Sequence, residues 1–157
     1  MPAEPARLTQ LDTVLTTALT LIKTPLDAAI LLIPTMPRIK SYGTGDPTWV
    51  PDTQYPTVRA SGTMRPMAQT AGRTIEPHYN LDFIVAFKAR ETDEAYLDGC
   101  RLADLIMQAM LANDVYPPYW RYINRSSVRV APAAAPEGQW QGGLFSCEAI
   151  GDQVSWT

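Results

Sequence analysis

The sequence holds a single histidine, His78, which follows Glu76 and Pro77 at the start of a long alternating stretch. An imidazole acts as a general base only when a partner group orients it and a reacting group lies within hydrogen-bonding reach. No recognisable spacing in the sequence supplies either group, so a structural or surface role is the favoured interpretation of His78. With no second histidine, a histidine-rich metal site is excluded.

Four carboxylates gather in a short acidic run. They are Glu91, Asp93, Glu94 and Asp98. Carboxylate oxygens bind Mg²⁺, so a small metal-dependent enzyme is one hypothesis for this chain. The simpler interpretation is that acidic side chains in the first turn of a helix are stabilised by the helix dipole. A further possibility is an acidic patch that repels DNA phosphates or contacts a neighbouring subunit.

Two other motifs could suggest chemistry and do not carry it. Gly43-Thr44-Gly45 lacks the remaining spacing of a dinucleotide or phosphate loop and is interpreted as a turn. Ser146-Cys147-Glu148 lies in a strand pattern and not in a nucleophile elbow. Cys100 and Cys147 belong to no metal-binding pattern, so we expect two buried reduced thiols, although a disulfide between them stays open. We therefore expect no enzyme activity, no metal and no cofactor.

Arginine, methionine and tryptophan side chains gather in and near the loops of the first half of the chain. These residue types are enriched at the cores of protein interfaces, and long ordered loops are often binding loops. A mobile surface loop is the alternative. The predicted contact residues are Arg38, Lys40, Trp49, Arg59, Met64, Arg65, Met67 and Arg73.

Composition indicates one ordered globular domain. The chain has 157 residues, of which 46% are hydrophobic and 18% are charged, and this length suffices for a substantial core. Its 14 prolines are more than average usage predicts. They concentrate in residues 25–77 and 117–136, so we expect a Pro-rich loop region over 34–56, and a flexible arm over residues 1–6.

The net charge of −3 argues against a dedicated nucleic-acid-binding surface, which needs a dense basic stripe. The charge is unevenly divided, because residues 1–90 carry nine basic and seven acidic side chains and residues 91–157 carry four and nine. The N-terminus lacks the pattern of a signal peptide. The apolar stretch Ala28–Ile33 is too short to span a bilayer, so we expect a soluble protein made in a cytoplasm.

The core unit is predicted to be a long strand over Tyr79–Arg90 that leads into a helix over Asp93–Ala112. Apolar side chains alternate along the strand and place one continuous apolar face on the sheet. The strand is longer than the helix that covers it, so one end should protrude. The residues expected on the core face of the helix are Tyr96, Cys100, Ala103, Ile106, Met107 and Met110.

Shorter elements complete the prediction. A helix is expected from about Thr9 to Ile22, with Pro25 either ending it or starting a second one. Strands are expected at 38–42, 57–64, around Val128 and Val130, and over Trp140–Trp156, with a projecting loop from Pro66 to Arg73 and a flexible loop at 131–139. The fold class is α+β: a two-layer sandwich with a mainly antiparallel sheet of about four to five strands, two helices packed on one face and a long projecting hairpin.

This arrangement resembles the tail terminator proteins of long-tailed bacteriophages, the lambda-type family. The N-terminal helix around Leu11–Ile22, the strand entry Tyr55–Ala60, the strand Tyr79–Arg90 leading into its helix, and the terminal strands ending at Trp156 carry the resemblance. The chain departs from the family pattern in its Pro-rich segment 34–56 and in the apolar stretch Pro25–Ile33.

The resemblance implies a structural virion protein of the tail or neck, assembled in the host cytoplasm. Such a protein forms a homohexameric ring on the tail tube protein, ends tube growth and offers an attachment surface to the neck or head connector. DNA would pass through the ring without specific binding. Another head–tail joining protein, a connector or stopper, is the nearest alternative. A monomeric ligand-binding domain is another, with the aromatic cluster of Tyr116, Tyr119, Trp120 and Tyr122 lining a pocket.

Overall fold

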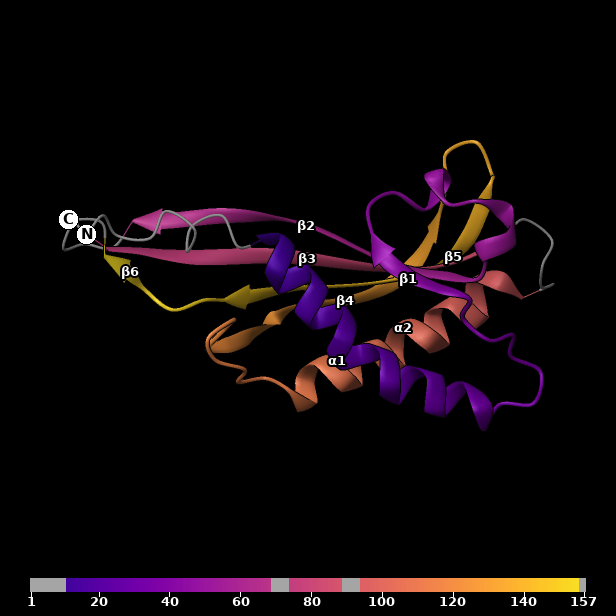
Figure 1. The fold of residues 1–157 in the computed structure, drawn as a ribbon, viewed down its shortest axis with the longest axis horizontal. Coiled ribbons are helices and arrows are strands. Elements are labelled where there is room, and N and C mark those ends of the chain that lie inside the picture. The colour runs from indigo at the N-terminus through magenta and orange to yellow at the C-terminus, as the bar shows by residue number, and fades with distance from the viewer. Residues whose placement is uncertain (1–10, 69–73, 89–93, 156–157) are drawn as a thin grey trace.

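The computed structural model describes residues 11–68, 74–88 and 94–155 and forms a two-layer α+β sandwich (Figure 1). The predicted arm at residues 1–6 lies outside the described residues. The elements, in chain order, are α1 (Leu11–Leu31), β1 (Ser41–Thr44), the short 3₁₀ turns η2 (Pro47–Trp49) and η3 (Asp52–Gln54), β2 (Thr57–Ala68), β3 (Thr74–Lys88), α2 (Ala95–Ala112), β4 (Tyr122–Ala134), β5 (Trp140–Ile150) and β6 (Val154–Ser155).

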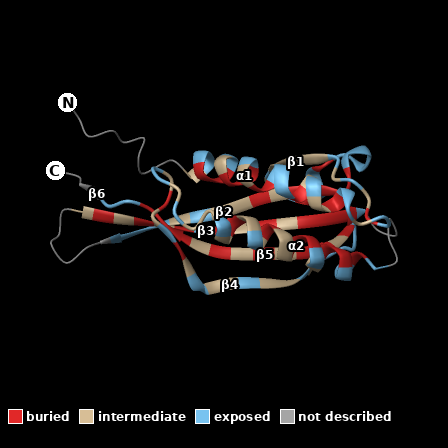
Figure 2. Ribbon diagram, turned by 90° about the horizontal axis from the view of Figure 1, so that it is seen from below, coloured by how far each residue is buried: buried red, intermediate tan, exposed pale blue. Residues whose placement is uncertain are grey.

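The sheet has the strand order β1-β2-β3-β5-β4, and β6 adds to β3 outside this path. Among the described strands, only the β1–β2 pair is parallel, and the other pairs are antiparallel. Helix α1 packs over β1 and β2, and α2 packs over β3, β5 and β4. Both helices lie on the same face of the sheet (Figures 1 and 2). The α+β class, the mainly antiparallel sheet and the two helices on one face are therefore confirmed.

The alternation along β3 builds the core. Its odd-numbered side chains point to the helices, and Leu81, Phe83 and Phe87 are fully buried there. The ring of Phe83 stacks on that of Phe145 from β5, with ring centroids 5.9 Å apart. Figure 2 shows the buried residues following the middle strands beneath the two helices. We call the sheet face under the helices the helix face and the opposite one the open face.

Helix α1 is continuous from Leu11 to Leu31, with Pro25 inside it. The expected break at Pro25 is therefore wrong. The exposed Pro25 lacks only the N–H that would bond the carbonyl of Leu21, and the apolar face on both sides of it packs on the sheet. By length and composition alone α1 could cross a membrane, but its seven buried side chains are those of a core helix in this fold.

Helix α2 begins at Ala95, and its core face differs from the prediction. Ala103, Ile106 and Met110 are buried as expected, but Tyr96 is 45% exposed and Leu102 is buried instead. The side chains of Cys100 and Met107 are only half-buried. The reason is that Gly99 of α2 lies directly against the sheet backbone. This contact sets the orientation of α2 about its own axis and so decides which of its side chains face the core.

The second half contains more regular strand than predicted. Strand β4 extends to Ala134, so the expected flexible loop is strand over its first four residues. Strand β5 ends at Ile150, and the chain then leaves it for β3, where Gly151 donates its N–H to the carbonyl of Pro77 at 2.8 Å. The single final strand to Trp156 is therefore wrong, and Trp156 itself lies outside the described residues.

The β2–β3 ladder extends past both helices (Figure 1). Its register runs from Thr57 opposite Ala86 to Ala68 opposite Ile75. Pro66 lies within the ladder, opposite Pro77, so the predicted loop from Pro66 is strand over its first residues. The connection 69–73 lies outside the described residues, so the hairpin itself stays a prediction. We call residues 61–67 and 74–80 the distal ladder.

Candidate assembly surfaces

The predicted contact residues fall on several surfaces and do not form one patch. Arg38 and Lys40 are exposed just before β1 at one margin of the sheet. Trp49 is 81% exposed in η2, above the open face. Arg65 and Met67 are exposed on the distal ladder, and Arg73 lies outside the described residues. The sequence identified surface residues here but could not group them, because grouping depends on strand register.

Met64 points away from the other predicted contact residues of the distal ladder. It lies one position from Arg65, so it points to the helix face while Arg65 points to the open face. There the half-buried Met64 packs against the main hydrophobic core. A contact role for Met64 stays a prediction, but it would lie on the helix face and not beside Arg65.

Arg59 lies across the backbone of β1. A Cβ atom built on Gly43 would lie 2.3 Å from Nη1 of Arg59, so glycine is what leaves room for this guanidinium. The Nε atom of Arg59 is buried and has no hydrogen-bond partner among the described residues. Arg59 is therefore a half-buried cation at the β1 margin, more constrained than an ordinary surface arginine.

A network of ionic side chains, which we call the distal charge cluster, lies on the open face of the distal ladder. His78 Nε2 lies 2.9 Å from Glu76 Oε1, and His78 Nδ1 lies 3.4 Å from Glu148 Oε2. The three side chains are only 14–16% exposed. Glu148 also accepts from Asn124 Nδ2 at 3.2 Å and lies 3.8 Å from Arg65. The cluster thus joins β2, β3, β5 and β4.

Arg121 links this cluster to the chain beyond β5. Its guanidinium pairs with Glu76, and its Nε donates to the carbonyl of Gly151 at 3.2 Å and lies 3.8 Å from Asp152. Each half-buried carboxylate of the cluster therefore has a cationic or donor partner, as burial of charge requires. No pattern in the sequence predicted this network, because its members come from separate strands.

The distal charge cluster is organised for rigidity. Among the described residues, His78 pairs with two carboxylates and with no hydroxyl or thiol, so this geometry offers it no nucleophile to activate. Within the described ranges, no group of three His, Cys, Asp or Glu side chains could hold a metal ion. What the arrangement can do is fix β2 and β3 to β5 beyond the helices.

The predicted acidic patch is only partly described. Glu91 and Asp93 lie outside the described residues, and Glu94 is exposed at the start of α2. Asp98 is only 9% exposed and pairs with Arg101, with Nη1 and Oδ1 3.3 Å apart. Asp98 is therefore not part of an exposed acidic surface, because the rotation of α2 turns it towards the sheet.

A second, smaller core covers one end of the open face. Val50, Tyr55, Ala135 and Trp140 pack there, and Trp140 Nε1 donates to Thr48 Oγ1 at 3.3 Å. A cavity of about 310 Å³ opens beside it. It is lined by Gly45, Asp46, Pro47, Trp49, Ser61, Ile84 and Trp140.

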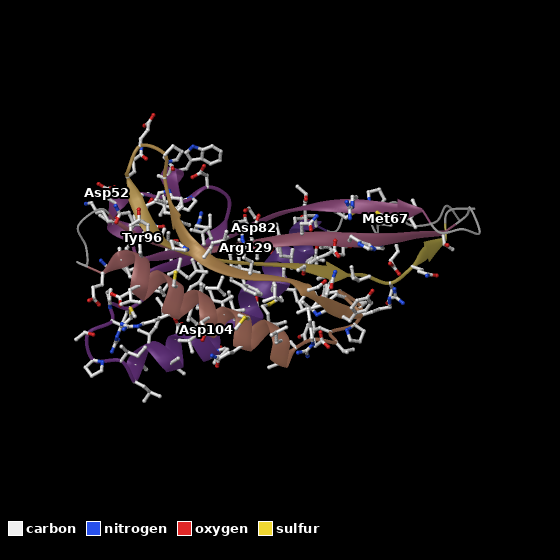
Figure 3. All side chains as sticks on the ribbon, turned by 180° about the vertical axis from the view of Figure 1, so that it is seen from behind. Asp52, Met67, Asp82, Tyr96, Asp104 and Arg129 are labelled. Carbon is white, nitrogen blue, oxygen red and sulfur yellow. The ribbon has the colours of Figure 1, made fainter. Side chains whose placement is uncertain are left out.

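Further along the open face, Asp82 of β3 faces towards Arg129 of β4 (Figure 3). Burial raises the pKa of the Asp82 carboxyl, and the Arg129 charge opposes this shift.

The aromatic residues after α2 pack mostly on the main core. Trp120 is fully buried and donates its Nε1 proton to the carbonyl of Asn113 at 2.8 Å. The rings of Tyr116 and Tyr119 stack with centroids 5.9 Å apart and pack on the main core, while Tyr122 is 44% exposed. Trp120, Tyr116 and Tyr119 therefore pack on the core, and a ligand pocket at these residues stays a prediction.

Comparison with known proteins gives no identification: no family model matches the chain, and no curated protein matches it. The geometry described above therefore carries the functional argument.

Proposed function

We propose that this protein is a structural subunit of a bacteriophage tail, a tail terminator that forms a ring on the end of the tail tube. The ring stops tube growth and offers its far side to the neck or head connector. The observation that carries the proposal is the β2–β3 ladder that extends past both helices (Figure 1). It gives one subunit a long, firm surface for contact with another protein.

The distal ladder is built to hold its shape without cover from the helices. Ion pairs of the distal charge cluster join β2 to β5 through Arg65 and Glu148, and β3 to the segment after α2 through Glu76 and Arg121. Preorganised surfaces lose less conformational entropy on binding than flexible ones. Met67, which is 37% exposed and lies far out on the ladder, is a contact residue of a type favoured at interfaces (Figure 3).

The charge distribution supports the same proposal. A net charge of −3 suits a ring through which DNA passes without being held, because affinity for DNA comes mainly from neutralisation of phosphates by basic side chains. An isolated subunit with exposed contact residues on several sides also suits a ring, in which each copy contacts two neighbours through different surfaces.

The test is tube assembly in vitro. The purified protein is added in small amounts to polymerising tail tube protein from the same phage, and tube lengths are measured by electron microscopy. We expect shorter tubes, each with gold-labelled protein at one end. Unchanged tube lengths together with label absent from the ends would contradict the proposal. A connector or stopper would bind finished tails without shortening growing tubes.

A matched pair of variants links this activity to the distal ladder. Met67→Glu places a charge on the ladder, and Val115→Glu places one on an apolar side chain that is 64% exposed away from it. We expect Met67→Glu to lose tube capping with little change in melting temperature, and Val115→Glu to keep it. Equal capping by both variants would contradict a contact role for the ladder.

A further inference from the structure

Strands β1 and β4 form the two margins of the sheet and lie at its opposite sides (Figure 2). Among the described residues, each has a single strand neighbour, β2 for β1 and β5 for β4. The outer backbone groups of a margin strand are a template for pairing with another chain. The molecule therefore carries two templates, one on each side.

Residues of β1 and β4 lie at the same positions along the strand direction, on opposite sides of the sheet. Following the paired residues across the strands leads from Ser41 to Ala133, and from Thr44 to Val130. The intervening partners are Thr57, Ala86 and Gly142 in the first row, and Ala60, Phe83 and Phe145 in the second. A second copy placed beside the first without displacement along the strands would thus meet β1 with residues 130–133.

The strand directions also match. β1 runs parallel to β2, and each later step across the sheet, to β3, β5 and β4, reverses direction. β4 therefore runs opposite to β1. If the strands run along the ring axis, a copy related by rotation about that axis keeps its strand directions, so its β1 would pair antiparallel with β4 of its neighbour.

The charges beside the two margins are complementary at these levels. Arg38 precedes β1 and Glu137 lies in the turn between β4 and β5, at the same end of the sheet, while Arg129 is level with the Gly45–Asp46 turn at the other end of β1. Arg38, Arg129 and Glu137 are exposed. Arg38 has no ion-pair partner in the described part of the chain, whereas Arg129 faces Asp82 of its own chain.

Among the described residues, β1 pairs with β2 alone and packs against α1. A cavity of about 300 Å³ lies between α1 and β1, lined by Leu19, Lys23 and Tyr42 among others. The hydroxyl of Tyr42 donates to Asp27 Oδ1 at 2.5 Å, and Lys23 Nζ lies 5.5 Å from the centre of the Tyr42 ring. These contacts hold Tyr42 against α1, on the helix face of the sheet.

From these observations we propose that copies of this chain join head to tail, with β4 of one copy pairing antiparallel with β1 of the next. Residues 130–134 lie against residues 40–44, and the sheet continues from subunit to subunit. Glu137 of one copy pairs with Arg38 of its neighbour, and Arg129 pairs with Asp46. The inference rests on the ring of the proposed function and specifies its contact.

Disulfide trapping tests the register. Lys40 and Ala134 are exposed and level with each other in the proposed pairing. We expect a mixture of Lys40→Cys and Ala134→Cys chains, in a Cys100→Ala background, to form crosslinked dimers under mild oxidation about tenfold faster than a mixture of Lys40→Cys and Ser126→Cys chains, because a disulfide forms only between closely placed Cα atoms. Equal rates for the two mixtures, or crosslinked dimers from Lys40→Cys alone, would overturn the proposal.

A charge exchange tests the ion pair. We expect Glu137→Lys to weaken ring formation severalfold in native mass spectrometry, and the double variant Glu137→Lys with Arg38→Glu to restore it. Failure of the double variant to restore rings would overturn this contact. Rings that form without the expected crosslink would overturn the β1–β4 contact alone, whereas a chain that stays monomeric and does not bind tubes would contradict the proposed function.

Discussion

Gly99 of α2 and Gly143 of β5 lie in direct backbone contact. A Cβ atom built on Gly99 would lie 2.2 Å from the nitrogen of Gly143, and one built on Gly143 would lie 2.2 Å from the carbonyl carbon of Gly99. No side chain could shift to relieve either clash. The pair thus sets how closely α2 approaches the sheet and which of its residues face the core.

Gly99→Ala should destabilise the protein. Alanine in a helix interior is ordinarily favoured over glycine by about 1 kcal/mol. Here the added methyl group would meet backbone, and overpacking of this kind costs about 1–3 kcal/mol or more. The measurement is the urea midpoint. Gln108→Ala, on the exposed side of α2, is the control and should change little. A stabilised Gly99→Ala variant would mean that α2 does not approach the sheet this closely.

Pro25→Ala should stabilise the protein. Proline inside a helix costs about 3 kcal/mol relative to alanine, while its loss restores about 0.4–1 kcal/mol of conformational entropy to the unfolded chain. Pro25 is exposed, so the substitution leaves the core intact, and we expect a net gain of about 2 kcal/mol. Thr24→Ala is the neighbouring control. A Pro25→Ala variant less stable than the wild type would contradict a continuous helix α1.

Arg121→Ala should destabilise far more than Arg125→Ala. Arg121 neutralises the half-buried Glu76, and removal of a partner from a buried charged group costs about 1–3 kcal/mol or more. Arg125 pairs with Asp114 at 3.8 Å and its side chain is 69% exposed, and such surface pairs contribute about 0–1 kcal/mol. Thermal melting of both variants measures the difference. Equal melting temperatures would show that the distal charge cluster does not hold the ladder.

Stability should fall as the solution becomes alkaline. Burial raises the pKa of Tyr79, Tyr55 and Tyr42, and raises the pKa of the Cys147 thiol from 9.0 to about 12. These groups ionise more readily in the unfolded chain, so the stability that they contribute is present at lower pH and is lost as pH rises from about 9 upwards. Urea midpoints at about pH 8 and about pH 10.5 test this sign. Tyr79→Phe should show a smaller loss, and an unchanged wild-type midpoint would contradict the burial of these groups.

The two thiols should differ in reactivity. Cys147 is 4% exposed with its pKa raised by burial, and Cys100 is half-buried on α2. Because the thiolate is the reactive form, iodoacetamide should modify Cys100 of the native protein and reach Cys147 only after unfolding. Peptide mass spectrometry locates the label. Equal native labelling of both would contradict the packing of β5 under α2.

Local patterns in the sequence sufficed for the main layers. The alternation in residues 79–87 and the helical spacing of Ala103, Ile106 and Met110 predicted the core strand and its covering helix, because side-chain direction follows from backbone geometry alone. The same reasoning failed at Pro25 and at Tyr96. There, packing against the sheet outweighed a local preference.

The candidate surfaces were less predictable than the fold. Arg65 and Met67 could be named as contact residues from their type. Met64, by contrast, points to the helix face and packs against the core. This orientation depends on the register of β2 against β3. The pairing of His78 with Glu148 depended on two strands meeting that are far apart in sequence.

By itself, the sequence determined the class of fold, the long strand β3 and the helix that follows it, because each depends on periodicity within one segment. Only the tertiary structure decided the continuous helix α1, the Gly99–Gly143 contact, the distal charge cluster and the level of β1 relative to β4. Each of these is a relation between segments that are distant in the chain. Strand register sets such relations, and a shift of one residue would turn every side chain of a strand to the other face.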